Sequence, residues 1–146
     1  MKFLLKRINY IIWLFVLQGL IQTPEIFAQP TPVTTKIEIV YFHAPNRCPS
    51  CLATESETKK ILETNFRSEI EKGQVSFESL DLKDDKNKAL VEKYEIVFPA
   101  LLILKKKGNK EVKTDYSTTA FQYAYPEPMK YEKLLQAEIL KRLHSK

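Results

Sequence analysis

Two cysteines separated by two residues, Cys48 and Cys51, are the side chains of this chain most suited to chemistry. Pro49 suits the first turn of a helix, where its missing N–H costs nothing. The partial positive charge at a helix N-terminus stabilises a thiolate and lowers its pKa, and the cationic Arg47 adds to that charge. Cys48 can therefore attack a disulfide in a partner, and Cys51, about one helical turn later, can resolve the mixed disulfide. The nearby His43 is placed to tune Cys48 by its charge.

Other uses of the cysteine pair stay open on residue types alone. A structural zinc ion needs four ligands, but the chain holds only two cysteines and two histidines, and His144 lies far from His43 in the sequence. A structural disulfide suits an oxidising compartment, although a bridge that closes so short a loop adds little stability. Two neighbouring thiols can also capture a soft ion such as arsenite. We assign no metal ligands, and we expect no cofactor because no flavin- or nicotinamide-binding fingerprint is visible.

The elements on either side of the pair are those needed to hold it at the start of a helix. Residues 37–42 (IEIVYF) are branched and aromatic, as in a buried strand, and a loop follows them. A helix is predicted over residues 49–71, ended by Gly73. The apolar residues that recur on one face of this helix are Leu62, Phe66 and Ile70.

The rest of the chain alternates strands with helices. Residues 75–82 form a predicted strand whose alternation slips at Ser79, which indicates a bulge. Further predicted elements are helices at 88–94 and 129–143, strands at 100–104 and 111–116 joined by a turn at 107–109, and a loop at 117–128. Strand–helix–strand units favour a parallel arrangement, and the hairpin adds antiparallel strands. The predicted fold class is therefore α/β, with a central mixed sheet and flanking helices.

The N-terminal residues 1–28 carry the pattern of a secretory signal peptide. Basic residues precede an apolar stretch at 8–21 that is short for a membrane-spanning helix, and Ala28 is a small residue at a plausible cleavage edge. Residues 29–35 are predicted to be a linker, and residues 36–146 the domain. An uncleaved N-terminal anchor is the alternative to cleavage. In both cases we expect a periplasmic or otherwise exported domain, which contacts a membrane only if the segment stays uncleaved.

Composition and charge narrow the classes of function. The chain is 44% hydrophobic and 28% charged with only 3 glycines, which is ordinary for a globular protein and argues against disorder or a channel. The net charge of +5 is mild. The short basic run at residues 105–107 is expected to be a solvated strand end and turn, so we expect no nucleic-acid partner.

Two stretches, residues 39–51 and 97–108, resemble the signature regions of the thioredoxin superfamily. The resemblance covers roughly residues 36–143 and implies a thioredoxin-like three-layer fold. It also implies that Pro99 is a cis-proline facing the cysteine pair, and that Phe98 offers backbone contacts to a bound partner.

A shorter motif narrows the resemblance. It consists of residues 41–44 (YFHA), residues 47–49 (RCP), Cys51, Glu55 and Thr58. The motif resembles the ArsF-like family of exported thioredoxin-like bacterial proteins, which are associated with arsenic-handling genes and often labelled as a nitrophenyl-compound nitroreductase subunit. The nitroreductase label has no support in these residues. The resemblance implies, as an alternative function, a dithiol accessory or binding protein for arsenite or another soft metal ion.

Departures from thioredoxin leave the direction of electron flow open. Arg47 stands where thioredoxin has a tryptophan, and Tyr41 and Phe42 stand where a buried acid would assist the second cysteine. Pro49 resembles glutaredoxin-like and some disulfide-forming motifs. We predict an exported thiol–disulfide oxidoreductase. Its expected partners are a disulfide- or thiol-containing protein and a membrane electron donor or acceptor.

Overall fold

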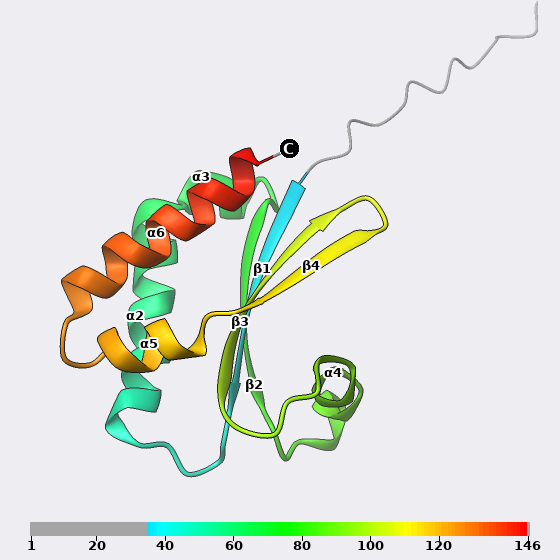
Figure 1. Ribbon diagram of the computed structural model, residues 1–146, viewed down its shortest axis with the longest axis vertical. Helices are drawn as coiled ribbons and strands as arrows, with labels where there is room; N and C mark the ends of the chain where they lie inside the picture. The colour runs from blue at the N-terminus through cyan, green and yellow to red at the C-terminus, as the bar shows by residue number, and fades with distance from the viewer. Residues whose placement is uncertain (1–34, 146) are drawn as a thin grey trace, which may run out of the picture. The chain divides into compact units, whose positions relative to one another are not determined.

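The computed structural model describes residues 35–145, which form a mixed β-sheet between helical layers (Figure 1). The four strands are β1 (Thr35–His43), β2 (Val75–Asp81), β3 (Ala100–Lys107) and β4 (Lys110–Asp115), in the order β2-β1-β3-β4. The expected signal peptide and residues 29–34 of the expected linker lie outside the described residues. Thr35, the last residue of that linker, pairs with Lys107 in the sheet.

Strand β1 organises the sheet because it pairs on both sides. It runs parallel to β2, with His43 opposite Asp81, and antiparallel to β3, with Phe42 opposite Ala100. A parallel pair needs a crossover connection, which the helices between β1 and β2 supply. β3 and β4 form an antiparallel hairpin, and Gly108 in its turn has a φ of 59°, a conformation that favours glycine. The predicted mixed sheet is therefore confirmed.

Helices cover the two faces of this sheet unequally (Figure 1). On one face lie α2 (Pro49–Asn65), α3 (Arg67–Glu71), α5 (Ser117–Tyr123) and α6 (Pro128–His144), and on the other lie the 3-10 turn η1 (Asp85–Asn87) and α4 (Lys88–Tyr94). Alternate residues of β1 point into the two cores: Ile37, Ile39 and Tyr41 into the larger, and Val40 and Phe42 into the smaller. β1 and the first half of β3 are buried on both faces, which explains their continuous apolar runs.

The helix predicted over residues 49–71 is broken at Phe66. Its backbone, at φ −130° and ψ 24°, leaves the helical region, so α2 ends before it and α3 begins after it. The Phe66 side chain is only 1% exposed, whereas Ile70, predicted to share its buried face, is 38% exposed. The prediction of one continuous helix is wrong, because the chain turns to bury Phe66 in the larger core.

Two further expectations differ from the structure. The segment predicted as a loop at 117–128 contains helix α5, whose Ala120 is fully buried in the larger core. Local propensity is weak in this Ser- and Thr-containing stretch, and packing against α2 and α6 overrides it. The bulge expected at Ser79 is absent from the described sheet, since β2 pairs with β1 in unbroken register. The apolar and polar residues stop alternating at Ser79 because the strand is partly buried on both faces there.

Three tyrosines have phenol groups withdrawn from solvent in this part of the protein. Tyr131 on α6 is fully buried, and its hydroxyl lies 2.6 Å from the Thr58 Oγ1 on α2. Burial raises the pKa of Tyr131 and raises the pKa of Tyr116 to about 12. Burial also raises the pKa of Tyr41, against a smaller opposing effect of the Arg47 charge. All three side chains therefore stay neutral in the folded protein above pH 10.

We expect these three phenols to make the fold less stable in alkali. Below pH 10 they are protonated in both states, and their contribution to stability is intact. As the pH rises from 10 to about 12, the unfolded chain ionises its tyrosines while the folded protein resists, so the free energy of unfolding falls. Tyrosinate absorbance at a pH between these values should rise further when guanidinium unfolds the protein, because the buried phenols of Tyr116 and Tyr131 ionise only then. An absorbance that does not change on unfolding at this pH would contradict the prediction.

Candidate active site

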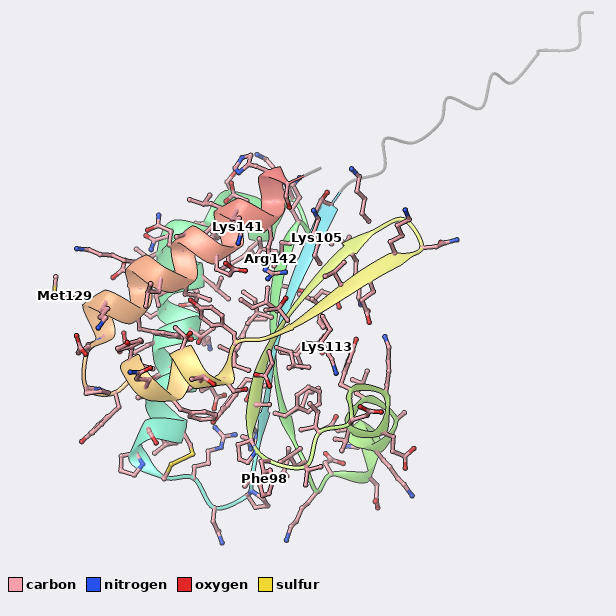
Figure 2. The ribbon with its side chains drawn as sticks, viewed as in Figure 1. Phe98, Lys105, Lys113, Met129, Lys141 and Arg142 are labelled. Atoms are coloured by element: carbon pink, nitrogen blue, oxygen red, sulfur yellow. A yellow bond between two sulfur atoms is a disulfide. The ribbon has the colours of Figure 1, made fainter. Side chains whose placement is uncertain are left out.

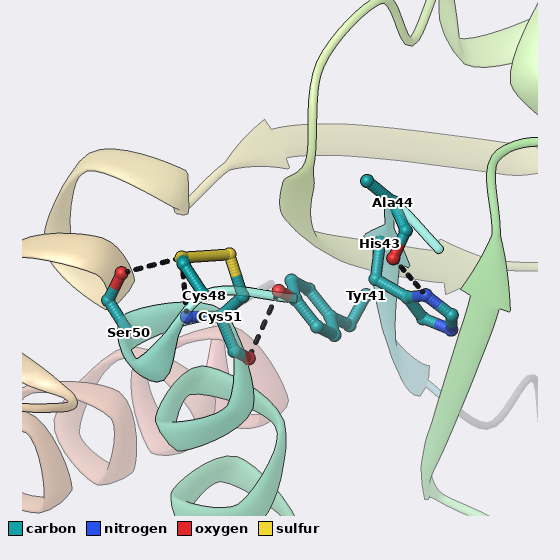
Figure 3. Close-up of a disulfide and its surroundings, with 6 residues drawn as sticks. All are labelled: Tyr41, His43, Ala44, Cys48, Ser50 and Cys51. Carbon is teal, nitrogen blue, oxygen red and sulfur yellow. Dashed lines mark hydrogen bonds between the residues drawn. A yellow bond between two sulfur atoms is a disulfide. The ribbon is translucent and has the colours of Figure 1, made fainter. Parts of the chain in front are cut away.

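The cysteine pair lies where the loop after β1 enters α2 (Figure 3). Cys48 is the N-cap residue of α2, with extended backbone at φ −77° and ψ 164°, and Pro49 occupies the first turn. The two sulfurs form a disulfide, with 5.1 Å between the Cα atoms. The predicted placement of the pair at a helix N-terminus is therefore confirmed.

Hydrogen-bond donors converge on the Cys48 sulfur. The Cys51 backbone N–H donates to the Cys48 Sγ at 3.3 Å, and the Ser50 hydroxyl lies 3.1 Å from the same sulfur (Figure 3). Cys48 is exposed, whereas Cys51 is half-buried. Donors at a helix start stabilise a thiolate, so this arrangement suits Cys48 as the sulfur that meets a partner. Ser50 is not among the site residues predicted from the sequence, although its place inside the motif is a signal that could have found it.

Arg47 contacts both His43 and Glu55, the latter on α2. The Arg47 Nη1 group donates to the Glu55 Oε2 in an ion pair, and the Arg47 Nη2 group donates to the His43 Nε2. The structure thus brings the two predicted supporting residues together. It adds Glu55, which the sequence marked only as part of a family motif. No hydrogen bond joins either residue to Cys48 in the described part of the chain.

The hydrogen bonds of His43 define its tautomer. Its Nδ1 lies 3.1 Å from the Ala44 carbonyl oxygen, which can only accept, so Nδ1 carries the proton. Its Nε2 faces an Arg47 N–H and must therefore accept. The ring is neutral in this arrangement, is 8% exposed, and points away from the disulfide (Figure 3). His43 therefore contacts Arg47 and not the disulfide, and its predicted effect on Cys48 stays a prediction.

The chain matches no protein-family model and no curated protein. Solved structures do match. The first two thioredoxin domains of Naumovozyma dairenensis Eps1p are 18% identical, with a TM-score of 0.52, over 84% of this chain and 43% of that one. The fold is thioredoxin-like. Two further solved structures are similar. One is an uncharacterised thioredoxin-like protein of Clostridium perfringens, with 20% identity and a TM-score of 0.45 over 76% of this chain and 77% of that one. The other is a thioredoxin of Thermus thermophilus, with 15% identity and a TM-score of 0.41 over 73% of this chain and 75% of that one.

Within the thioredoxin-like fold, Tyr41 occupies the β1 position beneath the second cysteine. Its side chain is fully buried, and its hydroxyl donates to the Cys51 carbonyl oxygen at 3.1 Å (Figure 3). Because burial raises the pKa of this phenol, Tyr41 is a neutral donor at physiological pH and not a base. The hydrogen bond holds the first turn of α2 against β1, so Tyr41 positions the pair and does not deprotonate Cys51.

The peptide bond before Pro99 is trans, as are the other peptide bonds of residues 35–145. The expectation of a cis-proline is therefore wrong. The trans isomer is the lower-energy form of an X-Pro bond. Here Pro99 leads directly into β3 at Ala100, and Phe98 is turned outward and 77% exposed. The exposed Phe98 lies at the same end of the sheet as the disulfide (Figure 2).

A shallow groove runs beside Phe98 and Pro99. It is lined by the segment from Tyr94 to Ala100 and by residues of β3, β4 and the start of α5, and it has a volume of about 440 Å³. Val97 beside Phe98 is also 77% exposed. These apolar side chains are exposed, and the expected backbone contact of Phe98 with a partner stays a prediction. Across residues 35–145, no group of three metal-ligating side chains is present, and no helix has the length and apolarity to cross a membrane.

Proposed function

We propose that this protein is an exported thiol–disulfide oxidoreductase that works through Cys48 and Cys51. One observation carries the proposal: an exposed Cys48 sulfur caps the N-terminus of α2, within disulfide reach of a more buried Cys51. A helix N-terminus lowers the pKa of a thiol and raises the fraction of reactive thiolate at neutral pH. The asymmetry in exposure assigns the roles, because a partner reaches Cys48 first.

The exchange follows from these positions. In the reduced protein, the Cys48 thiolate attacks a disulfide of a partner, forming a mixed disulfide and releasing one partner thiolate. The Cys51 thiol then loses its proton and attacks the Cys48 sulfur. This step closes the Cys48–Cys51 disulfide and releases the second partner thiolate. Two electrons pass to the partner, which takes up two protons as its thiols form. In the opposite direction, a partner dithiol is oxidised and the pair is reduced.

Export is part of the proposal. It is supported by the basic start, the apolar stretch at 8–21 and the small Ala28. In an oxidising compartment a dithiol form must be regenerated, so a reductase there requires a membrane electron donor. An oxidase would instead need an acceptor of the same two electrons. The substrate would be a protein bearing a disulfide or a pair of thiols.

The reduction potential of the Cys48–Cys51 pair is the first measurement we would make, by equilibration in glutathione redox buffers. We expect a reduction potential at which glutathione buffers can convert the pair between disulfide and dithiol. A potential near that of thioredoxin, about −270 mV, would indicate a reductase, and one near about −120 mV would indicate a protein that introduces disulfides. A potential far below about −300 mV, with no exchange with a model disulfide, would contradict the proposal and identify a structural bridge.

A second candidate function is capture of arsenite by the reduced pair. The 5.1 Å between the Cα atoms places both sulfurs within reach of a single soft ion, and the short motif around them resembles that of the ArsF-like family. Arsenite should then protect both thiols of the reduced protein from alkylation. Unchanged alkylation rates in excess arsenite would exclude this function and leave the redox proposal standing.

A further inference from the structure

Arg47, the cation next to Cys48 in sequence, is held on two sides by different elements of the fold. Glu55 reaches it from α2, and His43 reaches it from the end of β1. The Arg47 and Glu55 side chains are only 24% and 26% exposed, so solvent screens their ion pair incompletely. The neutral His43 ring fixes the second guanidinium edge by accepting from it. The Arg47 guanidinium is thus paired with Glu55, and within residues 35–145 no hydrogen bond joins it to the Cys48 sulfur.

We propose that Glu55 is a positioning residue whose carboxylate holds the Arg47 guanidinium and withholds its positive charge from the Cys48 thiolate. The proposal rests on the redox function above, since a thiolate exists only in the reduced pair. It deepens that function by naming a residue that shifts the balance between dithiol and disulfide.

The direction of the effect follows from electrostatics. A free cation beside Cys48 stabilises the thiolate and therefore the reduced pair, which makes the protein more oxidising. A cation already paired with a carboxylate does this much less. Glu55 therefore keeps the potential lower and the Cys48 thiolate more basic, and a more basic thiolate is the stronger nucleophile.

The test is Glu55→Gln, an isosteric change at a half-exposed site that leaves both cysteines in place. We expect the equilibrium with glutathione to move toward the dithiol by about three- to tenfold, and tenfold corresponds to about 30 mV. The pH midpoint of Cys48 alkylation should fall by about half a unit to one unit. Glu55→Asp keeps the charge on a shorter side chain and should stay nearer the wild-type values. Thermal unfolding confirms that each variant folds.

Glu57→Gln is the matched control on the same helix. The Glu57 side chain is 24% exposed and pairs with Lys60 at 3.3 Å, much as Glu55 pairs with Arg47, but it is not linked to Arg47. We expect this variant to leave both the glutathione equilibrium and the alkylation midpoint unchanged. An equal shift in the two variants would mean that any lost carboxylate has the same effect, and it would overturn the proposal.

A double-mutant cycle with Arg47→Gln separates positioning from simple charge. If Glu55 acts through Arg47, Glu55→Gln shifts the equilibrium more in the wild-type background than in the Arg47→Gln background. Equal shifts in the two backgrounds would show that the carboxylate acts directly, and the inference would fail. If the wild-type protein exchanges disulfides and the Glu55→Gln variant shows the same equilibrium and alkylation midpoint, the inference about Glu55 is refuted and the proposed function is not. A wild-type protein that exchanges nothing would refute the proposed function itself.

Discussion

Cys48→Ser is expected to abolish thiol–disulfide exchange, lowering the rate by at least about 1,000-fold, as when the nucleophile of a covalent mechanism is removed. Cys48 is the exposed sulfur of the pair, and donors from Ser50 and the start of α2 surround it. A serine hydroxyl cannot form the mixed disulfide, and it is not ionised at neutral pH. The half-buried Cys51 is poorly placed to replace it. Reduction of a model protein disulfide by the pre-reduced variant measures the loss.

Two further variants make this experiment decisive. Cys51→Ser keeps the attacking sulfur and lacks the resolving one, so it should accumulate a mixed disulfide with its partner, visible by mass spectrometry without reductant. Ser50→Ala keeps both cysteines and removes one donor to Cys48, so its rate should stay within about tenfold of wild type. Full activity of Cys48→Ser would show that Cys48 is not the nucleophile. Trapping of partners by Cys48→Ser and not by Cys51→Ser would show that the roles of the two cysteines are reversed.

Phe66→Ala is expected to cost about 3–5 kcal/mol of the free energy of unfolding. The Phe66 ring is 1% exposed in the larger core, at the break between α2 and α3. Removing it leaves a cavity lined by apolar side chains that the surrounding helices and sheet fill only in part. Since domains of this size are stable by about 5–15 kcal/mol, the variant should lose a large share of its stability. Urea denaturation of wild type and variant measures the difference.

Ile70→Ala is the matched control, because the sequence placed Ile70 on the same helical stripe. The structure leaves its side chain 38% exposed on α3. The variant should therefore lose less than about 1 kcal/mol. Comparable losses at Phe66 and Ile70 would mean that the predicted continuous helix, and not the observed break, describes the protein.

The cysteine pair and its immediate setting could be predicted from the sequence because they depend on local patterns. A buried apolar strand, a proline suited to a helix start and two cysteines one turn apart specify where the thiols lie. The α4 helix was predicted at the bounds that the structure gives it, Lys88–Tyr94. The mixed sheet followed from the order of the elements. In each case a short stretch of chain carries the information, through backbone preference or through the period of its apolar residues.

The tertiary structure decided what depends on residues far apart in sequence or on competition between local and global packing. The helix breaks at Phe66 because the core buries that ring, and α5 forms because α2 and α6 offer it a surface. The bond before Pro99 is trans, against the expectation from resemblance. The contacts of Arg47 with Glu55 and His43 join a loop, a helix and a strand end. Neither the spacing of apolar residues nor helix and strand propensity encodes such contacts, since they arise only when β1, its loop and α2 are packed together. This packing determines which charged side chains lie near a thiolate.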